Sequence, residues 1–212
     1  MAALNDPIPA QWNDYVTQSP VALEVVQDVI YDTLTYTSAS TTELIFFAES
    51  IATVTRDVTN MTVAGMLPNP ESFLIQAPRL YIKWLPTNTL GATELTGSVI
   101  SDLALLVNTG IVTFVFGTKR YGPIPLWMLS AGGGPDVRLA VSDTSTAGAN
   151  QNRMISYAQL GGPLFAFFPH LMLSPLQAFS ASMTWPAGAV TLGAGNPKIS
   201  LVFEGQRARA IQ

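Results

Sequence analysis

The chain has 212 residues, of which 10 are Lys or Arg and 14 are Asp or Glu, so its formal net charge is −4. Charged residues make up 11% of the sequence and apolar residues 48%, whereas ordinary soluble proteins carry about 25% charged residues. This composition excludes an intrinsically disordered chain and a strongly basic nucleic-acid-binding protein. No stretch approaches the ~20 unbroken apolar residues of a membrane-spanning helix. The shortage of charge predicts a surface that is buried against another molecule.

The charges are unevenly distributed along the chain. Residues 1–60 contain eight acids and one base, a net charge of −7, whereas residues 61–212 contain nine bases and six acids, a net charge of +3. The two parts are expected to attract each other or neighbouring copies, although chance placement in a charge-poor chain explains the asymmetry equally well. We predict an acidic N-terminal arm over residues 1–30 and a single domain over residues 31–212.

Most of the domain is predicted to form strands, because Val, Ile, Thr and aromatic residues dominate its segments. Residues 20–36 are ambiguous, since Ser19-Pro20 suits a helix start, but the β-branched and aromatic run 29–36 favours a strand. Further strands are predicted at Leu44–Phe47, Ala52–Arg56, Phe73–Trp84, Ile111–Phe116, Val137–Val141 and Arg153–Ala158.

One helix and one hairpin interrupt this pattern. Residues 99–108 place Leu103, Leu106 and Val107 on one face, and Gly110 follows the predicted end of the helix. Residues 117–120, Gly-Thr-Lys-Arg, are predicted as a hairpin turn, because glycine tolerates the positive φ that such turns need.

Two C-terminal segments alternate with period two. In residues 179–185 the odd positions are apolar and the even positions are Ser or Thr, and Ile199, Leu201 and Phe203 share one face of the last segment. Such alternation is typical of strands with one face on a core. The fold class is therefore predicted to be all-β, a sandwich or barrel of two facing antiparallel sheets with one short inserted helix.

The sequence offers little from which to build a catalytic or metal site. It contains no cysteine and one histidine, His170, which lies among apolar neighbours and is better explained as a packed neutral side chain than as a general base. A glycosidase would need two facing carboxylates, but the acids after residue 60 are scattered and are expected to be surface residues. These acids are Glu71, Glu94, Asp102, Asp136, Asp143 and Glu204.

Four other features have both a functional and a structural interpretation. The triple glycine 132–134 lacks the rest of a phosphate-binding motif and is interpreted as a loop. Asn60-Met61-Thr62 matches a glycosylation acceptor, and we interpret this match as incidental. Arg207 and Arg209 could contact a nucleic acid or a membrane surface, but they are expected to pair with acids of a neighbouring copy. Nine aromatic residues could line a sugar site, but their spacing is that of strand cores; they are Phe46, Phe47, Trp84, Phe114, Phe116, Trp127, Phe165, Phe167 and Phe168.

We therefore predict a protein that is not an enzyme and that has no catalytic, cofactor-binding or metal-binding residue. The excess of apolar, hydroxylic and Pro- or Gly-rich surface indicates large interfaces buried in an assembly. The alternative is a carbohydrate-binding β-sandwich, either a lectin or a receptor-binding virion protein.

A series of local phrases, in order over most of residues 30–212, resembles bacteriophage jelly-roll major capsid proteins of the icosahedral, tailless type. The phrases are Tyr31–Tyr36, Leu44–Phe47, Thr59–Met61, Gly65–Pro68, Phe73–Ile75, Gly110–Lys119, Tyr121, Pro125-Leu126, Gly132-Gly133, Leu201–Gly205 and Arg209–Gln212.

The resemblance implies a single jelly roll of eight strands in two sheets. It implies copies assembled as trimers or pseudo-hexameric capsomers into an icosahedral shell, with other virion proteins as further partners and the virion as the location. No catalytic residue or cofactor is carried over, no specific nucleic-acid binding is expected, and whether the shell encloses a membrane is left open. The acidic arm is expected to dock on a neighbouring copy, since a terminal segment with few partners stays mobile until it is bound.

Overall fold

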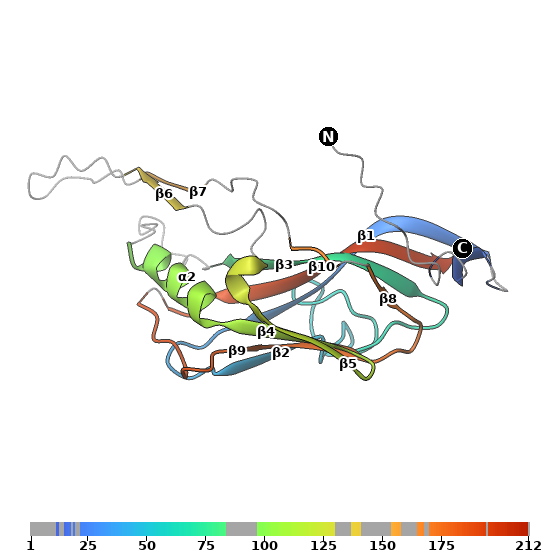
Figure 1. Cartoon of the computed structure of the whole chain (residues 1–212), viewed down its shortest axis with the longest axis horizontal. Coiled ribbons are helices and arrows are strands. Elements are labelled where there is room, and N and C mark those ends of the chain that lie inside the picture. Colours follow the sequence, from blue (N-terminus) through green and yellow to red (C-terminus); the bar gives the residue numbers. More distant parts are fainter. Residues whose placement is uncertain are drawn as a thin grey trace, which may run out of the picture.

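The computed structural model describes residues 12, 15–17, 19, 22–83, 97–129, 137–140, 154–157, 165–167, 170–193 and 195–211 (Figure 1). Residues 12 and 15–17 are helical, and the elements with given bounds are ten strands, one α-helix and one 3₁₀ turn. In chain order they are β1 (Leu23–Thr35), β2 (Glu43–Phe46), β3 (Ser72–Lys83), α2 (Gly97–Thr109), β4 (Ile111–Phe116), β5 (Lys119–Pro125), η1 (Leu126–Met128), β6 (Val137–Ala140), β7 (Met154–Tyr157), β8 (Leu171–Leu173), β9 (Phe179–Thr184) and β10 (Lys198–Ala210).

Eight of the strands form two four-stranded antiparallel sheets, with the orders β1-β10-β3-β8 and β2-β9-β4-β5. The pairing is nested, because β4 pairs with β5, β3 with β8, β2 with β9, and β1 with β10. A hairpin whose arms are rolled up so that alternate strand pairs fall in opposite sheets is a jelly roll. The predicted fold class is therefore confirmed. The remaining strands, β6 and β7, pair with each other.

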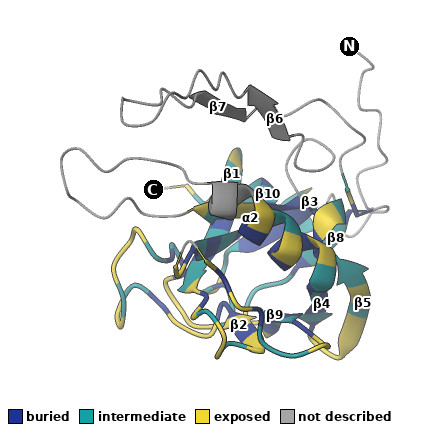
Figure 2. Ribbon diagram, turned by 90° about the vertical axis from the view of Figure 1, so that its left-hand side faces the viewer, coloured by how far each residue is buried: buried dark blue, intermediate teal, exposed yellow. Residues whose placement is uncertain are grey.

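The core lies between the two sheets, where the buried parts of the strands face each other (Figure 2). It is rich in aromatic side chains. Phe203 of β10 stacks on Phe47 at 4.9 Å between ring centroids and contacts Phe114 of β4 at 5.7 Å. Directly after β9, the indole N–H of Trp185 donates to the carbonyl of Leu106 at 3.1 Å. This hydrogen bond ties α2 to the sandwich. Aromatic pairs of this kind stabilise a core beyond the area that they bury.

Sequence periodicity predicted the strands with regular patterns well. Residues 111–116 form β4 as predicted, and the segments predicted at 44–47, 73–84, 137–141, 153–158 and 179–185 correspond to β2, β3, β6, β7 and β9 within one residue at each end. The helix predicted at 99–108 is α2. In β9 the odd residues Phe179, Ala181 and Met183 are buried, as the alternation indicated.

The strand predicted at residues 52–56 is wrong. This segment forms turns, in which the backbone N–H of Val54 donates to the carbonyl of Ser50 at 3.0 Å and the hydroxyl of Thr53 donates to the same oxygen at 3.0 Å. Hydroxyl side chains that bond to nearby backbone compete with a sheet ladder in this way. The turn predicted at residues 117–120 is shorter than predicted, because β5 already begins at Lys119. Gly117 has the expected positive φ, 60°.

Residues 23–30, predicted as part of the arm, lie in β1. This strand pairs with β10 along its whole length, and the register sets Glu24 opposite Arg209. Arg209 Nε lies 2.6 Å from Glu24 Oε1, and Arg207 Nε lies 2.8 Å from Asp28 Oδ2. The acidic residues of β1 are therefore held along the basic end of β10 by charge as well as by the backbone ladder.

Part of the predicted arm packs on the outer face of the β1-β10-β3-β8 sheet. Trp12 is buried against Leu74 of β3 and Ala208 of β10, and Tyr15 and Val16 pack on the same small cluster. The Tyr15 hydroxyl donates to the carbonyl of Pro70, and burial raises the pKa of Tyr15 above its usual value. This segment therefore covers one end of an outer sheet face.

Candidate functional site

His170 is buried beside the start of β8, as expected for a packed histidine. Its Nδ1 lies 3.1 Å from the carbonyl oxygen of Phe167, and the side chain is 8% exposed. Because a carbonyl oxygen only accepts hydrogen bonds, Nδ1 carries the hydrogen. The observed bond therefore gives His170 a structural role under the segment that precedes β8.

The carboxylates considered for a glycosidase are dispersed where the structure describes them. Glu204 pairs with Arg79 at 3.1 Å, Glu71 pairs with Arg207 at 3.2 Å, and Asp102 is buried in α2. Glu94, Asp136 and Asp143 lie outside the described residues. Within the described ranges, no group of three or more His, Cys, Asp or Glu side chains could hold a metal ion.

The aromatic residues considered for a sugar site are mostly core residues. Five of them are buried between the sheets and Phe165 packs on the edge of the same core; the buried five are Phe46, Phe47, Phe114, Phe116 and Phe167. Trp127 in η1 is the exception, with 48% of its surface exposed. Trp84 and Phe168 lie outside the described residues.

Asn60 and the C-terminal arginines have intrachain structural roles. The Asn60 side chain accepts a hydrogen bond from the backbone N–H of Tyr31 at 2.9 Å and donates to the carbonyl of Val29 at 2.8 Å. The side-chain amide of Asn60 therefore pairs with the edge of β1 as the backbone of a neighbouring strand would. Arg207 and Arg209, which were predicted to pair with acids of a neighbouring copy, have ion-pair partners within the chain. The triple glycine 132–134 lies outside the described residues.

Sequence reasoning missed Asp32, a buried carboxylate in β1. One of its oxygens accepts from the backbone N–H of Phe47 at 2.5 Å, and the other accepts from that of Thr33 at 3.0 Å. Phe47 has a φ of 66°, unusual for a bulky residue, so Asp32 holds the chain where it leaves β2. Burial raises the pKa of Asp32 above its usual value, and the negative charge of Glu49 raises it further. The backbone hydrogen bonds from Phe47 and Thr33 act in the opposite direction and lower this pKa.

We expect this buried carboxyl group to make stability depend on pH. The folded state binds the Asp32 proton more tightly than the unfolded chain does, so protonation of Asp32 stabilises the fold. This stabilisation is fully present below the pKa of aspartate in the unfolded chain, about 3.9. It is lost as the pH rises through the higher pKa of Asp32 in the folded state. Asp32→Asn removes this titration. The free energy of unfolding of the wild type, relative to that of Asp32→Asn, should therefore fall as the pH rises from about 4 toward neutrality. Urea unfolding of both proteins across this range measures the slope, and a slope of the opposite sign would contradict the assignment.

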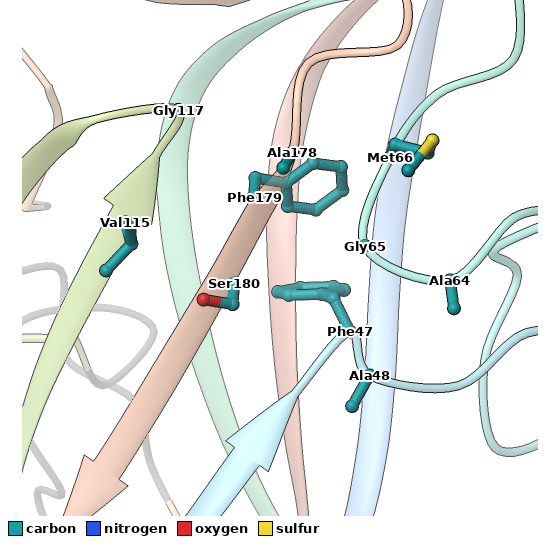
Figure 3. A pocket seen from close by; sticks show the side chains of 10 residues that line it. All are labelled: Phe47, Ala48, Ala64, Gly65, Met66, Val115, Gly117, Ala178, Phe179 and Ser180. Carbon is teal, nitrogen blue, oxygen red and sulfur yellow. The ribbon is translucent and has the colours of Figure 1, made fainter.

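An apolar hollow of about 320 Å³ lies where the β2-β9-β4-β5 sheet meets its connecting loops (Figure 3). Its floor is the start of β9, residues 178–180. One wall comes from Val115 and Gly117 at the end of β4, and the other from Phe47 and Ala48 after β2 together with residues 64–66. No lining residue carries a titratable side chain, so this hollow fits an apolar surface better than a reacting substrate.

The outer face of the same sheet carries little charge. The register and the burial of the odd residues of β9 place Ser180, Ser182 and Thr184 on this face, next to Ile45 of β2 and Val115 of β4. Ile45 is 53% exposed. Among the described strand residues on this face, only Glu43 and Arg120 are charged. The other outer face carries more charge, because Arg79 pairs with Glu204 near its centre and Lys83 lies opposite Lys198 at one end.

The comparisons with known proteins do not assign the chain to a family. Within the described residues, no helix combines the length and the hydropathy needed to cross a membrane. No family model, no curated protein and no solved structure matches the chain.

Proposed function

We propose that this chain is a structural virion protein, a major capsid protein of a bacteriophage, and that it assembles with copies of itself into an icosahedral shell. It acts by assembly and not by catalysis. The observation that carries the proposal is a jelly roll in which the outer face of the β2-β9-β4-β5 sheet is poor in charge. The sequence phrases that resemble jelly-roll capsid proteins support the same function.

A shell subunit needs a rigid body and lateral surfaces that copies can cover. The nested strands and the aromatic core supply the rigid body. Exposed apolar side chains supply part of the lateral surface, among them Ile45 at 53%, Leu176 at 62% and Val25 at 43%. Stable contacts bury about 800 Å² on each partner.

A carbohydrate-binding β-sandwich, either a lectin or a receptor-binding virion protein, is the second candidate. The observation that favours it is Trp127, an aromatic side chain about half exposed on η1. Aromatic rings with one exposed face are common at binding surfaces. A lectin should bind sugar as an isolated subunit, whereas a shell protein should associate with itself without any sugar.

The purified chain is expected to form trimers or larger particles. Sedimentation velocity over a concentration series up to high micromolar, followed by electron microscopy of the heaviest fraction, tests this expectation. A stable monomer at the highest concentration would contradict the capsid function. Binding of the monomer to a glycan array in the same buffer would favour the second candidate.

A further inference from the structure

We infer that the apolar hollow beside β9 is the centre of a twofold contact between two copies of this chain. The inference rests on the proposed function and deepens it, because it names the surface and the partner of one contact in the assembly. The occupant of the hollow is the same surface of a second copy.

The chemistry of the hollow fits a partner that brings apolar surface. Its lining consists of glycine and apolar side chains from alanine to methionine and phenylalanine, with the Ser180 hydroxyl as the polar side-chain group (Figure 3). Leu176 adds to this surface from the loop before β9. It is 62% exposed, and its backbone N–H donates to the carbonyl of Leu67 at 2.9 Å, next to the wall formed by residues 64–66. An exposed leucine beside an apolar hollow gains burial when another molecule covers both.

An arginine and a glutamate flank the lining of the hollow, each next to a residue of a different wall. Arg120 of β5 is the cross-strand partner of Val115, and such partners point to the same face of a sheet. On the opposite side, Glu49 directly follows the lining residue Ala48. Both charged side chains are exposed. Among the described residues, neither of them has an ion-pair partner.

A twofold axis through this surface makes the charge arrangement self-complementary. In a twofold contact each copy uses the same patch, so a group on one side of the axis meets the group on the other side of the partner. The wall with Arg120 then faces the partner's wall with Glu49, and this pairing occurs twice. The same rotation sets the two apolar hollows face to face and covers both copies of Leu176. Charge complementarity of this kind fixes the orientation of a contact and excludes others.

Charge reversal tests the contact directly. Glu49→Lys and Arg120→Glu are each expected to weaken self-association at least about tenfold, since each places two like-charge pairs at the contact. The double variant Glu49→Lys with Arg120→Glu restores opposite charges and should associate within about threefold of the wild type. Lys83→Glu is the matched control, because it changes the net charge as Arg120→Glu does but lies at the end of β3 in the other sheet, and it should leave this contact unchanged.

Leu176→Asn tests the apolar part of the contact. Leu176 has a φ of 58°, and asparagine tolerates this left-handed conformation better than leucine. The variant should therefore keep or raise its unfolding temperature while its self-association weakens at least about tenfold. A loss of thermal stability that accompanies the loss of association would overturn this role for Leu176.

Sedimentation velocity with the wild type beside each variant separates two kinds of failure. If the wild type assembles and both charge reversals assemble equally well, the twofold contact is overturned while the proposed capsid function stands. If the double variant associates no better than the single variants, the pairing of Glu49 with Arg120 is overturned. If the wild type remains monomeric at high micromolar concentration, the proposed function fails and the contact fails with it.

Discussion

Replacing Gly205 with alanine is expected to destabilise the sandwich by at least about 3 kcal/mol. Gly205 lies in β10 at a β-bulge, where the register to β3 shifts between Glu204 and Gly205. A Cβ atom at this position would lie 1.9 Å from the carbonyl oxygen of Leu74 and 2.9 Å from its carbonyl carbon. Both atoms belong to the backbone of the neighbouring strand, so the clash is relieved only if β3 and β10 move apart.

Gly188→Ala is the matched control for this prediction. Gly188 has a φ of 103°, but a Cβ atom there would have no neighbour within 4 Å. Its replacement costs the strain of a left-handed conformation, about 1–2 kcal/mol, and no clash. Chemical denaturation of both variants compares the two effects. If Gly205→Ala were no less stable than Gly188→Ala, the close approach of the two backbones would be contradicted.

The consequence of Gly205→Ala should extend to the ends of both strands. Beyond the bulge, β10 carries Arg207, whose guanidinium group pairs with Asp28 of β1 and with Glu71 before β3. Displacement of β10 would separate these groups, although such partly exposed pairs contribute at most about 1 kcal/mol each. Most of the lost stability is therefore expected to come from the sheet itself, and high salt should not reproduce the effect of the substitution.

The parts of the fold that the sequence predicted are those in which local pattern and burial agree. β9 alternates because one face lies on the core, and β4 is a run of β-branched and aromatic residues between two glycines. β5 was missed because it contains Gly122 and Pro123, which normally indicate a turn. β8 was missed because it has only three residues, too few to show a period.

The candidate contact surface could not be predicted from the sequence, because four distant segments build it. Ala48, Val115 and Ser180 come together only through the nested pairing of β2, β9 and β4. The same is true of the charges, since Arg209 meets Glu24 across 185 positions of the chain. Net charge indicated that the two ends attract, but only the register shows which groups meet.

Replacing Phe203 with alanine is expected to destabilise the protein by about 3–5 kcal/mol. The Phe203 ring is fully buried and lies between the two sheets. It stacks on Phe47 and contacts Phe114 at 5.7 Å, Phe116 at 5.9 Å and Phe179 at 6.4 Å. Its removal leaves a cavity among residues that come from both sheets, so the loss combines transfer of the ring to water with unfilled space.

Phe203→Leu separates the packing of the two sheets from the aromatic contacts. Leucine keeps much of the buried apolar volume but loses the ring contacts, which are worth about 0.5–1.5 kcal/mol for each pair. This variant should therefore lie between the wild type and Phe203→Ala in urea unfolding. Since Phe203 joins both sheets, unfolding followed by tryptophan fluorescence and by circular dichroism should shift to lower urea together. Separate transitions for the two signals would contradict a single cooperative sandwich and, with it, the rigid subunit that assembly into a shell requires.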